Sequence, residues 1–468
     1  MKVVIAGASG FVGQLLLEDL AKDFELIALG RSVPVQNVEL QKNSIAWRNC
    51  DLFSLLQTEK ALQGAEVGIY LVHSMLPRAR LTQSSFEDCD LLLADNFARA
   101  ALSAGVKRII YLGGLLPEGS ELSKHLSSRK EVEVALSRAA TPVTVLRSGL
   151  VLGAQGSSFQ MLFVLVKRLP VMICPRWTMT RTQCTAASDV VALIRFCLTD
   201  QRTVGRTFDV GGPEVLTYRK LMATLAEEMN VRRYFFSVPF FSPGLSRLWV
   251  QLITGGSRNL VSPLVQSLKH EMVVHDHSLM ELYGKPLLGV RESLRRCLTG
   301  LTPTLRSSTR QRWIQLRGRP EVRSIQRLPL PNGKNAEWVA DQYFDWLPHF
   351  LKPLIVVEKS AEDVWVFRLV FMKTPLLRLF YSRERSTSDR QLFYIRGGLL
   401  AKTEKDSNGR LEFREVLNRQ ACLAAIHEFR PSLPWLIYKY TQALAHLWVM
   451  RGFREYLQSV IGAEKKMG

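Results

Sequence analysis

Short apolar runs alternate with amphipathic stretches in the first third of the chain. Six runs have the length of a buried strand: Val3–Ala6, Leu26–Leu29, Ile45–Trp47, Val67–Val72, Arg108–Leu112 and Val143–Leu146. Helical patterns lie between them, as in Phe86–Ala104. Strands that alternate with helices form a parallel sheet covered by helices on both faces. The pattern therefore predicts an α/β domain with a doubly wound, Rossmann-type parallel sheet.

The last third of the chain has a different pattern. The predicted strands are Val322–Leu330, Val364–Met372, Gln391–Leu400 and Leu411–Leu417, and the predicted helices are Ala336–Phe350 and Pro434–Ser459. Large apolar residues alternate from Trp365 to Phe371, which gives that strand one apolar face. Asn408-Gly409 is typical of a tight hairpin turn. We predict an α+β domain in which a curved antiparallel sheet is covered by one long C-terminal helix.

A stretch rich in Ser, Thr, Arg and Pro separates these two patterns and predicts a linker over residues 301–321. The first predicted domain spans residues 1–300, with a parallel-sheet unit followed by a subdomain that folds back on it. The second spans residues 322–468. A length of 468 residues agrees with two domains, because single cores stop growing well below that size.

Composition narrows the class of protein. The chain is 47% hydrophobic and 22% charged, as globular proteins are. No apolar stretch approaches the roughly 18 residues of a membrane span, and the N-terminus carries no secretory pattern, so we expect a cytoplasmic protein. The seven cysteines include no C-x-x-C pair, so the spacing supports neither a zinc site nor a disulfide framework.

The formal charge of +20 is unevenly distributed. Residues 232–329 hold 16 Lys and Arg but only 5 Asp and Glu. Phe240, Phe241 and Trp249 lie among these bases, which favours peripheral contact with an anionic membrane surface, such as the inner face of the cell membrane. A solvated basic face, a substrate lid or a domain interface explains the same segment. The chain holds no recognisable nucleic-acid-binding module, so nucleic acid is not an expected partner.

A glycine motif follows the first strand. Gly7-Ala8-Ser9-Gly10-Phe11-Val12-Gly13 has the spacing G-x-x-G-x-x-G and precedes a predicted helix. Glycines let the backbone approach a pyrophosphate, and the N-terminus of the helix supplies unpaired N–H groups. We predict a dinucleotide site formed by Gly7, Ser9, Gly10, Phe11, Val12 and Gly13.

Three later positions extend this site. Arg31 and Ser32 end the second strand, where an NAD enzyme carries an acidic residue, and a guanidinium suits the 2′-phosphate of NADP. Asp51 and Leu52 follow the third strand and are placed to contact the adenine. Val72 and His73 end the fourth strand at the same edge of the sheet. The sequence therefore predicts NADP as the cofactor, with NADPH bound more tightly than NADH.

The motif, Arg31, Asp51 and the run 67–72 leading to His73-Ser74 resemble atypical, extended-type short-chain dehydrogenase/reductases. The segments 71–75 and 169–177 are similar to bacterial two-domain proteins that join such a domain to a C-terminal START-like helix-grip domain. The resemblance implies an NAD(P)-binding domain and a domain built around an apolar ligand.

Two departures concern the chemistry. The family places a Ser or Thr after the fifth strand, where this chain has Gly113-Gly114, and a Tyr-x-x-x-Lys pair on the next helix, where it has His125 and Arg129. The i, i+4 spacing puts His125 and Arg129 on one helix face. We predict that Arg129 holds the nicotinamide ribose and that His125 donates a proton as an imidazolium. A surface helix with no catalytic role is the alternative.

Two functions remain open at this point. One is an NADPH-dependent reductase of an apolar carbonyl compound, which the C-terminal domain binds or delivers. The other is a non-catalytic NADP(H)-binding sensor or stabilising subunit. The resemblance extends to relatives of that second kind, including the Rossmann accessory subunit of respiratory complex I. The glycine motif serves both functions, the replaced tyrosine favours the second, and the added domain favours the first.

Overall fold

The chain forms two compact units. The computed structural model describes residues 1–31, 45–73, 81–119, 121–238, 266–301, 321–360, 363–402 and 408–467. Unit 1 comprises residues 1–76 and 93–304, and unit 2 comprises residues 77–92 and 305–468. The linker predicted over 301–321 falls almost entirely outside the described residues. As borders of independently folding domains, the limits 1–300 and 322–468 stay a prediction.

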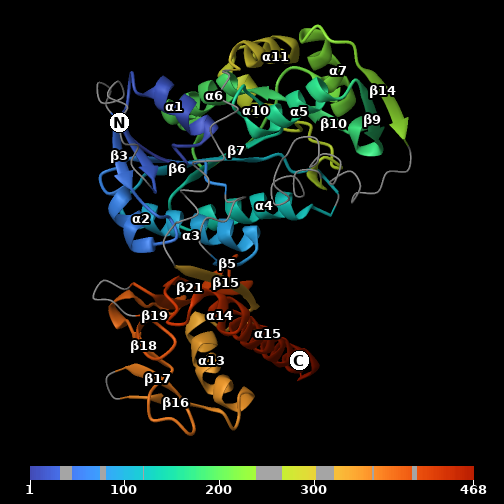
Figure 1. The fold of residues 1–468 in the computed structure, drawn as a ribbon. Helices are drawn as coiled ribbons and strands as arrows, with labels where there is room; N and C mark the ends of the chain where they lie inside the picture. Colours follow the sequence, from blue (N-terminus) through green and yellow to red (C-terminus); the bar gives the residue numbers. More distant parts are fainter. Residues whose placement is uncertain are drawn as a thin grey trace. The chain divides into compact units, whose positions relative to one another are not determined.

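Unit 1 is built on a parallel sheet of seven strands in the order β12-β7-β6-β4-β1-β2-β3 (Figure 1). The strands are β1 (Lys2–Ala6), β2 (Glu25–Gly30), β3 (Ile45–Asn49), β4 (Val67–Tyr70), β6 (Arg108–Gly114), β7 (Val143–Ser148) and β12 (Thr207–Val210). Every neighbouring pair in this sheet is parallel. The doubly wound parallel sheet predicted from the alternating pattern is confirmed.

Helices cover both faces of this sheet, as Figure 1 shows. α1 (Phe11–Leu20) and α6 (Ala187–Thr199) lie on one face, and α3 (Phe86–Ser103) and α4 (Lys124–Ser137) lie on the other, while α2 (Leu55–Leu62) connects β3 to β4. Leu16, Leu17 and Leu20 of α1 pack in one apolar cluster with Val190 and Ile194 of α6. With helices on both faces, strands such as β1 are buried along almost their whole length.

The later elements of unit 1 build a smaller layer around a second apolar cluster. They are β8 (Val151–Leu152), α5 (Ser157–Arg168), β9 (Val171–Pro175), η2 (Arg176–Met179), β10 (Arg181–Gln183), β11 (Thr185–Ala186), η3 (Gln201–Thr203), β13 (Val215–Thr217), α7 (Tyr218–Glu228), β14 (Tyr234–Val238), α10 (Ser278–Tyr283) and α11 (Val290–Thr299). Phe159 of α5, Leu221 of α7 and Leu294 of α11 are fully buried in this cluster. Residues 239–265 lie outside the described chain.

Unit 2 contains an eight-stranded sheet in the order β16-β17-β18-β19-β20-β21-β15-β5. Its strands are β5 (Leu81–Gln83), β15 (Val322–Pro329), β16 (Ile355–Lys359), β17 (Val364–Leu369), β18 (Leu377–Tyr381), β19 (Arg390–Gly397), β20 (Arg410–Val416) and β21 (Ala421–Phe429), with a short helix η4 (Arg383–Arg385). All pairs are antiparallel except β15 with β5. The predicted α+β class is confirmed, whereas the START-like resemblance stays a prediction.

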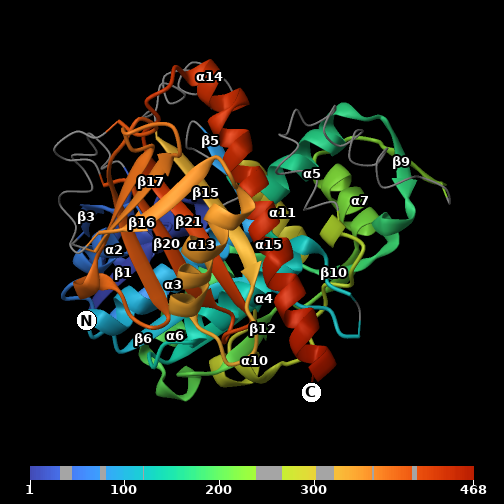
Figure 2. The ribbon, with the colours of Figure 1, turned by 90° about the horizontal axis from the view of Figure 1, so that it is seen from below.

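Aromatic rings form the core of unit 2. The ring of Phe344 on α13 (Ala336–Phe350) stacks on Trp365 with centroids 4.2 Å apart and meets Phe393 edge-on at 4.9 Å. Phe453 on α15 (Gln442–Met467) joins the same cluster. Both helices therefore pack on one face of the sheet, with α14 (Trp435–Tyr440) preceding α15 (Figure 2).

The single C-terminal helix predicted over Pro434–Ser459 is wrong. Thr441 separates α14 from α15, with φ −125° and ψ −84°, and its hydroxyl donates to the Ile437 carbonyl at 2.5 Å. A hydroxyl that bonds locally to the backbone competes with helix geometry. Tyr440, Leu444 and Trp448 of this segment do not face the sheet, since they are 63%, 54% and 55% exposed.

The tight hairpin at Asn408-Gly409 is also wrong. β19 ends at Gly397 and β20 begins at Arg410, so these two residues are only the last part of a longer connection. Phe371 was predicted to lie on the inner face of its strand, but β17 ends at Leu369 and Phe371 is 75% exposed. Trp365, Phe367 and Phe393 do lie in or against the core.

Candidate functional site

The turn between β1 and α1 has the geometry that a phosphate group requires. Gly7 has φ +91°, which a residue with a side chain rarely adopts, and its carbonyl accepts from the Gly10 amide at 2.9 Å. Gly10 is the N-cap of α1, no side chain caps the helix, and the first turn holds no acidic residue. The backbone N–H groups at this N-terminus are therefore directed at an anion rather than at a capping side chain.

Close backbone packing explains the other glycine positions. A Cβ on Gly13 would lie 2.3 Å from the Gly7 carbonyl oxygen and 2.8 Å from Ala8 backbone atoms, so only glycine fits there. A Cβ on Gly10 would meet only the Gly7 oxygen, at 3.1 Å. Gly13 thus holds α1 against the turn, and Gly10 lies at the exposed surface of the turn, where a ligand would approach.

The order of strands places this turn at a topological switch point. β1 pairs with β2 on one side and with β4 on the other. After β1 the sheet continues through β2 and β3 on one side, and from β4 it continues through β6 and β7 on the other side. Dinucleotides bind in the crevice at such a point, outside the carboxyl ends of the strands. Val72 and His73 follow β4 and lie at that edge; Val72 is half-buried and His73 is exposed.

The remaining residues predicted to bind the cofactor lie around the same edge with different roles. Arg31 is exposed directly after β2, and Ser32 lies outside the described residues. The Asp51 carboxylate accepts the Phe53 amide at 3.2 Å and so shapes the turn that leads to α2. The Leu52 carbonyl accepts from the Asn96 amide side chain at 2.7 Å. Contacts of Asp51 and Leu52 with adenine stay predictions.

The side chain of Phe11 in the glycine motif has a role that the sequence did not suggest. The Phe11 ring lies so close to Gly153 that a Cβ there would be 2.0 Å from it, so this ring packs within unit 1. Only the backbone of Phe11 then remains for a cofactor. Val12 is half-buried and Ser9 is exposed.

His125, the residue predicted to replace the family tyrosine, lies near His73. Their ring centroids are 5.3 Å apart, although one residue follows β4 and the other begins α4. The Nδ1 atom of His125 lies 3.2 Å from the Ser267 hydroxyl, which lies 3.0 Å from the Ser123 hydroxyl. Ser123 is the N-cap of α4 and accepts the Leu126 amide. The structure therefore gathers three polar side chains around His125.

Arg129 lies one turn further along α4 and is 5% exposed. A Cβ on Gly114 would be 3.5 Å from its Cγ atom, an ordinary contact, so Arg129 covers the carboxyl end of β6. A Cβ on Gly113 would lie 2.9 Å from the Tyr111 ring. The Tyr111 ring thus leaves no room for a Ser or Thr at position 113, which explains that departure from the family pattern.

Arg147, near the end of β7, forms an ion pair with Glu133. Its guanidinium donates to the Glu133 carboxylate at 2.7 Å. The hydrogen bond with Glu133 raises the pKa of Arg147, so the side chain stays charged at all ordinary pH values. Together with Arg129, this pair makes the α4 side of the crevice strongly polar.

Sequence reasoning missed Ser123, Ser267 and Glu133. Ser123 could have been predicted as the N-cap of α4, because serine is favoured at that position, where its hydroxyl accepts a backbone amide two or three residues later. Ser267 lies 142 residues from His125 in sequence, and no local pattern links the two. In the described part of the chain, no group of three or more His, Cys, Asp or Glu side chains is arranged to hold a metal ion. In the same residues, no helix is long and apolar enough to cross a membrane.

Part of the basic segment predicted to contact a membrane cannot be placed. Phe240, Phe241, Arg247, Trp249 and Arg258 all lie outside the described residues. Of its described residues, Arg233 donates to the Val166 carbonyl at 2.6 Å.

Comparison with known proteins agrees with the geometry of the first half. Residues 7–150 match a family described as NAD(P)H-binding. A stretch of 113 residues, 24% of the chain, is 34% identical to the auxiliary protein GraX of Staphylococcus aureus and covers 36% of it. A stretch of 245 residues is 24% identical to the mitochondrial subunit 9 of the NADH dehydrogenase 1 alpha subcomplex of Arabidopsis thaliana and covers 60% of it. The chain thus spans less than two thirds of either relative.

Solved structures resemble the same part of the chain. A nucleoside-diphosphate-sugar epimerase of Staphylococcus aureus superposes with a TM-score of 0.53 at 15% identity, over 63% of this chain and all of its own. An NADPH-dependent quinone oxidoreductase of Escherichia coli, complexed with NADPH, superposes with a TM-score of 0.51 at 19% identity, over 64% of this chain and all of its own. At such identities the likeness concerns the fold. Fold, glycine turn and family match together identify an NAD(P)-binding domain of the Rossmann type in unit 1.

Proposed function

We propose that the chain binds NADP(H) and reduces an apolar carbonyl compound. The observation that carries this proposal is the uncapped N-terminus of α1 at the β1–β4 switch point, with Arg31 at the end of β2. The backbone N–H groups suit a pyrophosphate, and a guanidinium suits a 2′-phosphate. The quinone oxidoreductase with the same fold, in complex with NADPH, supports a reductase.

His125 and Arg129 have separate roles in this proposal. A bound nicotinamide supplies hydride, and the protein must supply a proton to the carbonyl oxygen. The His125 imidazolium holds that proton, and its Nδ1–H donates to the Ser267 hydroxyl, which fixes the ring orientation. Arg129, one helical turn away and buried, holds the cofactor ribose. His73 lines the crevice beside His125, where the substrate would bind.

Cofactor preference tests the first part of the proposal. NADPH should bind on the order of tenfold or more tightly than NADH, because Arg31 forms a charge-assisted contact with the extra phosphate. The Arg31→Ala variant should lose that preference and keep its affinity for NADH. Equal affinities of the unaltered protein for the two cofactors, measured by fluorescence titration, would refute the NADP assignment.

Consumption of NADPH with a quinone or an aromatic aldehyde tests the second part. The rate should be higher at mildly acidic pH, because only the imidazolium form of histidine is a competent acid. The His125→Ala variant should lose this acidic rise. NADPH binding without turnover of any carbonyl compound would instead support a non-catalytic sensor or stabilising subunit. The glycines at positions 113 and 114 and the likeness to an NADH dehydrogenase subunit favour that second function.

Two further proposals concern partners. Unit 2 binds the apolar compound or delivers it to unit 1, as the START-like resemblance implies, and a fluorescent fatty acid or apolar dye retained by the full chain would support this. The protein contacts an anionic membrane surface peripherally, which its net charge of +20 supports. Its place would then be the cytoplasm and the inner face of the membrane.

A further inference from the structure

A line of large apolar side chains is exposed on the helices α14 and α15. The five residues, each between 51% and 69% exposed, are Leu436, Ile437, Tyr440, Leu444 and Trp448. Leu436 and Tyr440 lie four residues apart on α14, and Leu444 and Trp448 lie four residues apart on α15, so each pair lies on one side of its helix. Figure 2 shows α14 and α15 following one another along unit 2. We call this line the α14–α15 ridge.

Most of the ridge lies outside the core of unit 2, although the Trp448 ring packs against Phe350 with centroids 4.7 Å apart. The opposite side of the same helices supplies the core with Tyr438, Ala443, Met450, Phe453 and Leu457, all buried. The ridge residues are therefore additional apolar surface on elements that already have their core contacts. Exposed apolar residues scattered singly are ordinary, whereas a continuous row of five marks an interaction surface.

Positive charge prevails in the stretch between Glu428 and Glu455, which contains the ridge. Residues 429–454 contain four Lys or Arg and no Asp or Glu. Two of the four are engaged, because Arg430 pairs with Glu321 at 3.2 Å and Arg454 donates to the Arg327 carbonyl at 3.1 Å. Lys439 and Arg451 are exposed beside the ridge, and the Lys439 ammonium lies 5.1 Å from the centre of the Tyr440 ring.

The shape of the surface favours a lipid bilayer over a protein partner. A partner protein that binds one helix encloses it in a groove and reads spaced anchors. Helices that lie in a membrane surface instead combine an apolar face with flanking Lys and Arg, and Tyr and Trp settle at the headgroup level. The ridge has each of these features, including a Tyr and a Trp two helical turns apart.

From this combination we infer that the α14–α15 ridge docks the protein on an anionic lipid surface. Leu436, Leu444 and Trp448 enter the headgroup region, and Lys439 and Arg451 contact acidic headgroups. The inference places the proposed membrane contact on unit 2, whereas the sequence pattern placed it within residues 232–258. It is independent of cofactor binding and of any reductase activity.

Cosedimentation of the full chain with vesicles tests the inference. Vesicles of equal parts phosphatidylcholine and phosphatidylglycerol should bind the protein, and pure phosphatidylcholine should bind it much less. Leu444→Glu and Trp448→Glu should each weaken binding on the order of tenfold, because an acid on the ridge opposes both insertion and the negative surface. Leu102→Glu is the matched control: Leu102 is 52% exposed on α3, far from the ridge in sequence, and its change should leave binding unaltered.

NADPH affinity is measured on all three variants and should not change. Melting temperature should not change in Leu444→Glu and Leu102→Glu, whereas Trp448→Glu should lower it because the contact of the Trp448 ring with Phe350 is lost. No vesicle binding at low salt, or equal loss in all three variants, would overturn the inference. A third result would also overturn it: the unaltered chain self-associates but does not bind vesicles, and Leu444→Glu abolishes the self-association. The ridge would then contact a second copy of the chain. Vesicle binding that persists in a protein unable to bind NADPH would leave this inference standing and refute only the proposed function.

Discussion

The two sheets of this protein place their ionisable residues differently. In unit 1 the central strands β1 and β2 are charged only at their first residues, Lys2 and Glu25, and β4 carries no charge. In unit 2 the strands β19 and β20 carry Arg390, Glu412 and Arg414 within the strands, and all three side chains are at least nine-tenths buried. The central strands β1, β2 and β4 of unit 1 thus have no charged residue inside them, whereas β19 and β20 of unit 2 do.

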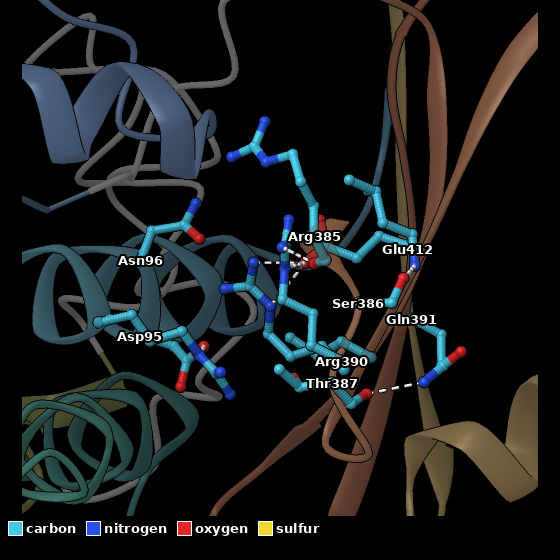
Figure 3. A network of polar contacts seen from close by, with 12 residues as sticks. Asp95, Asn96, Arg385, Ser386, Thr387, Arg390, Gln391 and Glu412 are labelled. Carbon is cyan, nitrogen blue, oxygen red and sulfur yellow. Dashed lines mark hydrogen bonds and ion pairs between the residues drawn. The ribbon is translucent and has the colours of Figure 1, made fainter. Parts of the chain in front are cut away.

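The charges inside the unit 2 sheet are paired with each other. Oε1 of Glu412 accepts from Nε of Arg390 at 2.6 Å and from Nε of Arg414 at 2.8 Å, and Figure 3 shows Glu412 beside Arg390. Burial by itself raises the pKa of Glu412, but Arg390 and Arg414 outweigh burial and hold the pKa well below its usual range. Burial lowers the pKa of the neighbouring His427, so this imidazole is neutral.

This difference separates groups that can serve a ligand from groups that serve the fold. At the edge of the unit 1 sheet, N–H groups and the side chains of Arg31 and His73 face the crevice or the solvent. The carboxylate of Glu412 has two guanidinium partners and no capacity left for chemistry. We therefore assign the buried ionisable residues Arg390, Glu412 and Arg414 of unit 2 to stability.

Removal of the Glu412 charge is the strongest test of the comparison. Glu412→Gln leaves Arg390 and Arg414 buried without their carboxylate, and breaking a buried pair costs about 3–5 kcal/mol. Urea unfolding should show this loss in the free energy of unfolding. Glu358→Gln is the matched control. Glu358 on β16 is exposed and pairs with Arg368, and loss of this ion pair should cost under about 1 kcal/mol. Equal effects of both changes would refute a structural role for the buried network.

Gly13→Ala should produce the next largest effect, in unit 1. The added Cβ would lie 2.3 Å from the Gly7 oxygen, so either α1 or the turn must move, at a cost of about 1–3 kcal/mol. NADPH affinity should also fall, because the turn that binds the pyrophosphate would be distorted. Gly10→Ala should weaken NADPH binding with much less loss of stability, because its Cβ meets only one atom at 3.1 Å.

Gly462→Ala is the control for both glycine changes, because nothing lies within 4 Å of a Cβ there. It should leave NADPH affinity unchanged and should not lower the melting temperature, because Gly462 lies within α15 and alanine favours a helix more than glycine does. A stable Gly13→Ala protein with unaltered NADPH affinity would show that the turn does not bind the cofactor.

The smallest expected effect is a dependence of the stability of unit 2 on pH. Burial lowers the pKa of His446 to about 4, and its Nε2 lies 3.0 Å from the Ser324 hydroxyl. Because the unfolded chain binds a proton near pH 6.5 and the folded chain does not, stability is full above that pH and falls as the pH drops towards 4. Between pH 7 and pH 5 the part of the loss due to His446 should reach at most about 2 kcal/mol, and the buried His427 adds a loss of the same sign. His446→Gln should flatten this part of the profile, and an unchanged slope would assign it to other groups.

The sequence predicted the elements whose pattern is set locally. β1, β2 and the glycine turn follow from apolar runs and a fixed spacing of glycines, because each strand is buried on both faces. The same reasoning failed where tertiary contacts decide. β21 contains Ala421, Ala424 and Ala425, which favour a helix, and becomes a strand through its pairing with β15 and β20.

The candidate site divides in the same way. The phosphate-binding half depends on backbone geometry and could be predicted from residues 7–13. The half around His125 depends on side chains from distant segments, so His125 could be proposed but its contact with Ser267 could not. The tight space at Gly113 also depends on the Tyr111 ring and has no signal in the sequence.

The strand β5 has a consequence for how the protein is made. Its residues are synthesised among the first hundred, but Gln83 accepts from Ser324, a residue 241 positions later. β5 must therefore wait unpaired until more than two hundred further residues have been synthesised, which exposes it to non-native pairing. A fragment that begins after the linker would also lack this strand and leave one edge of β15 open. The sheet of unit 2 is thus completed by two segments whose bonded residues lie 241 positions apart, and it cannot close before both segments have been synthesised.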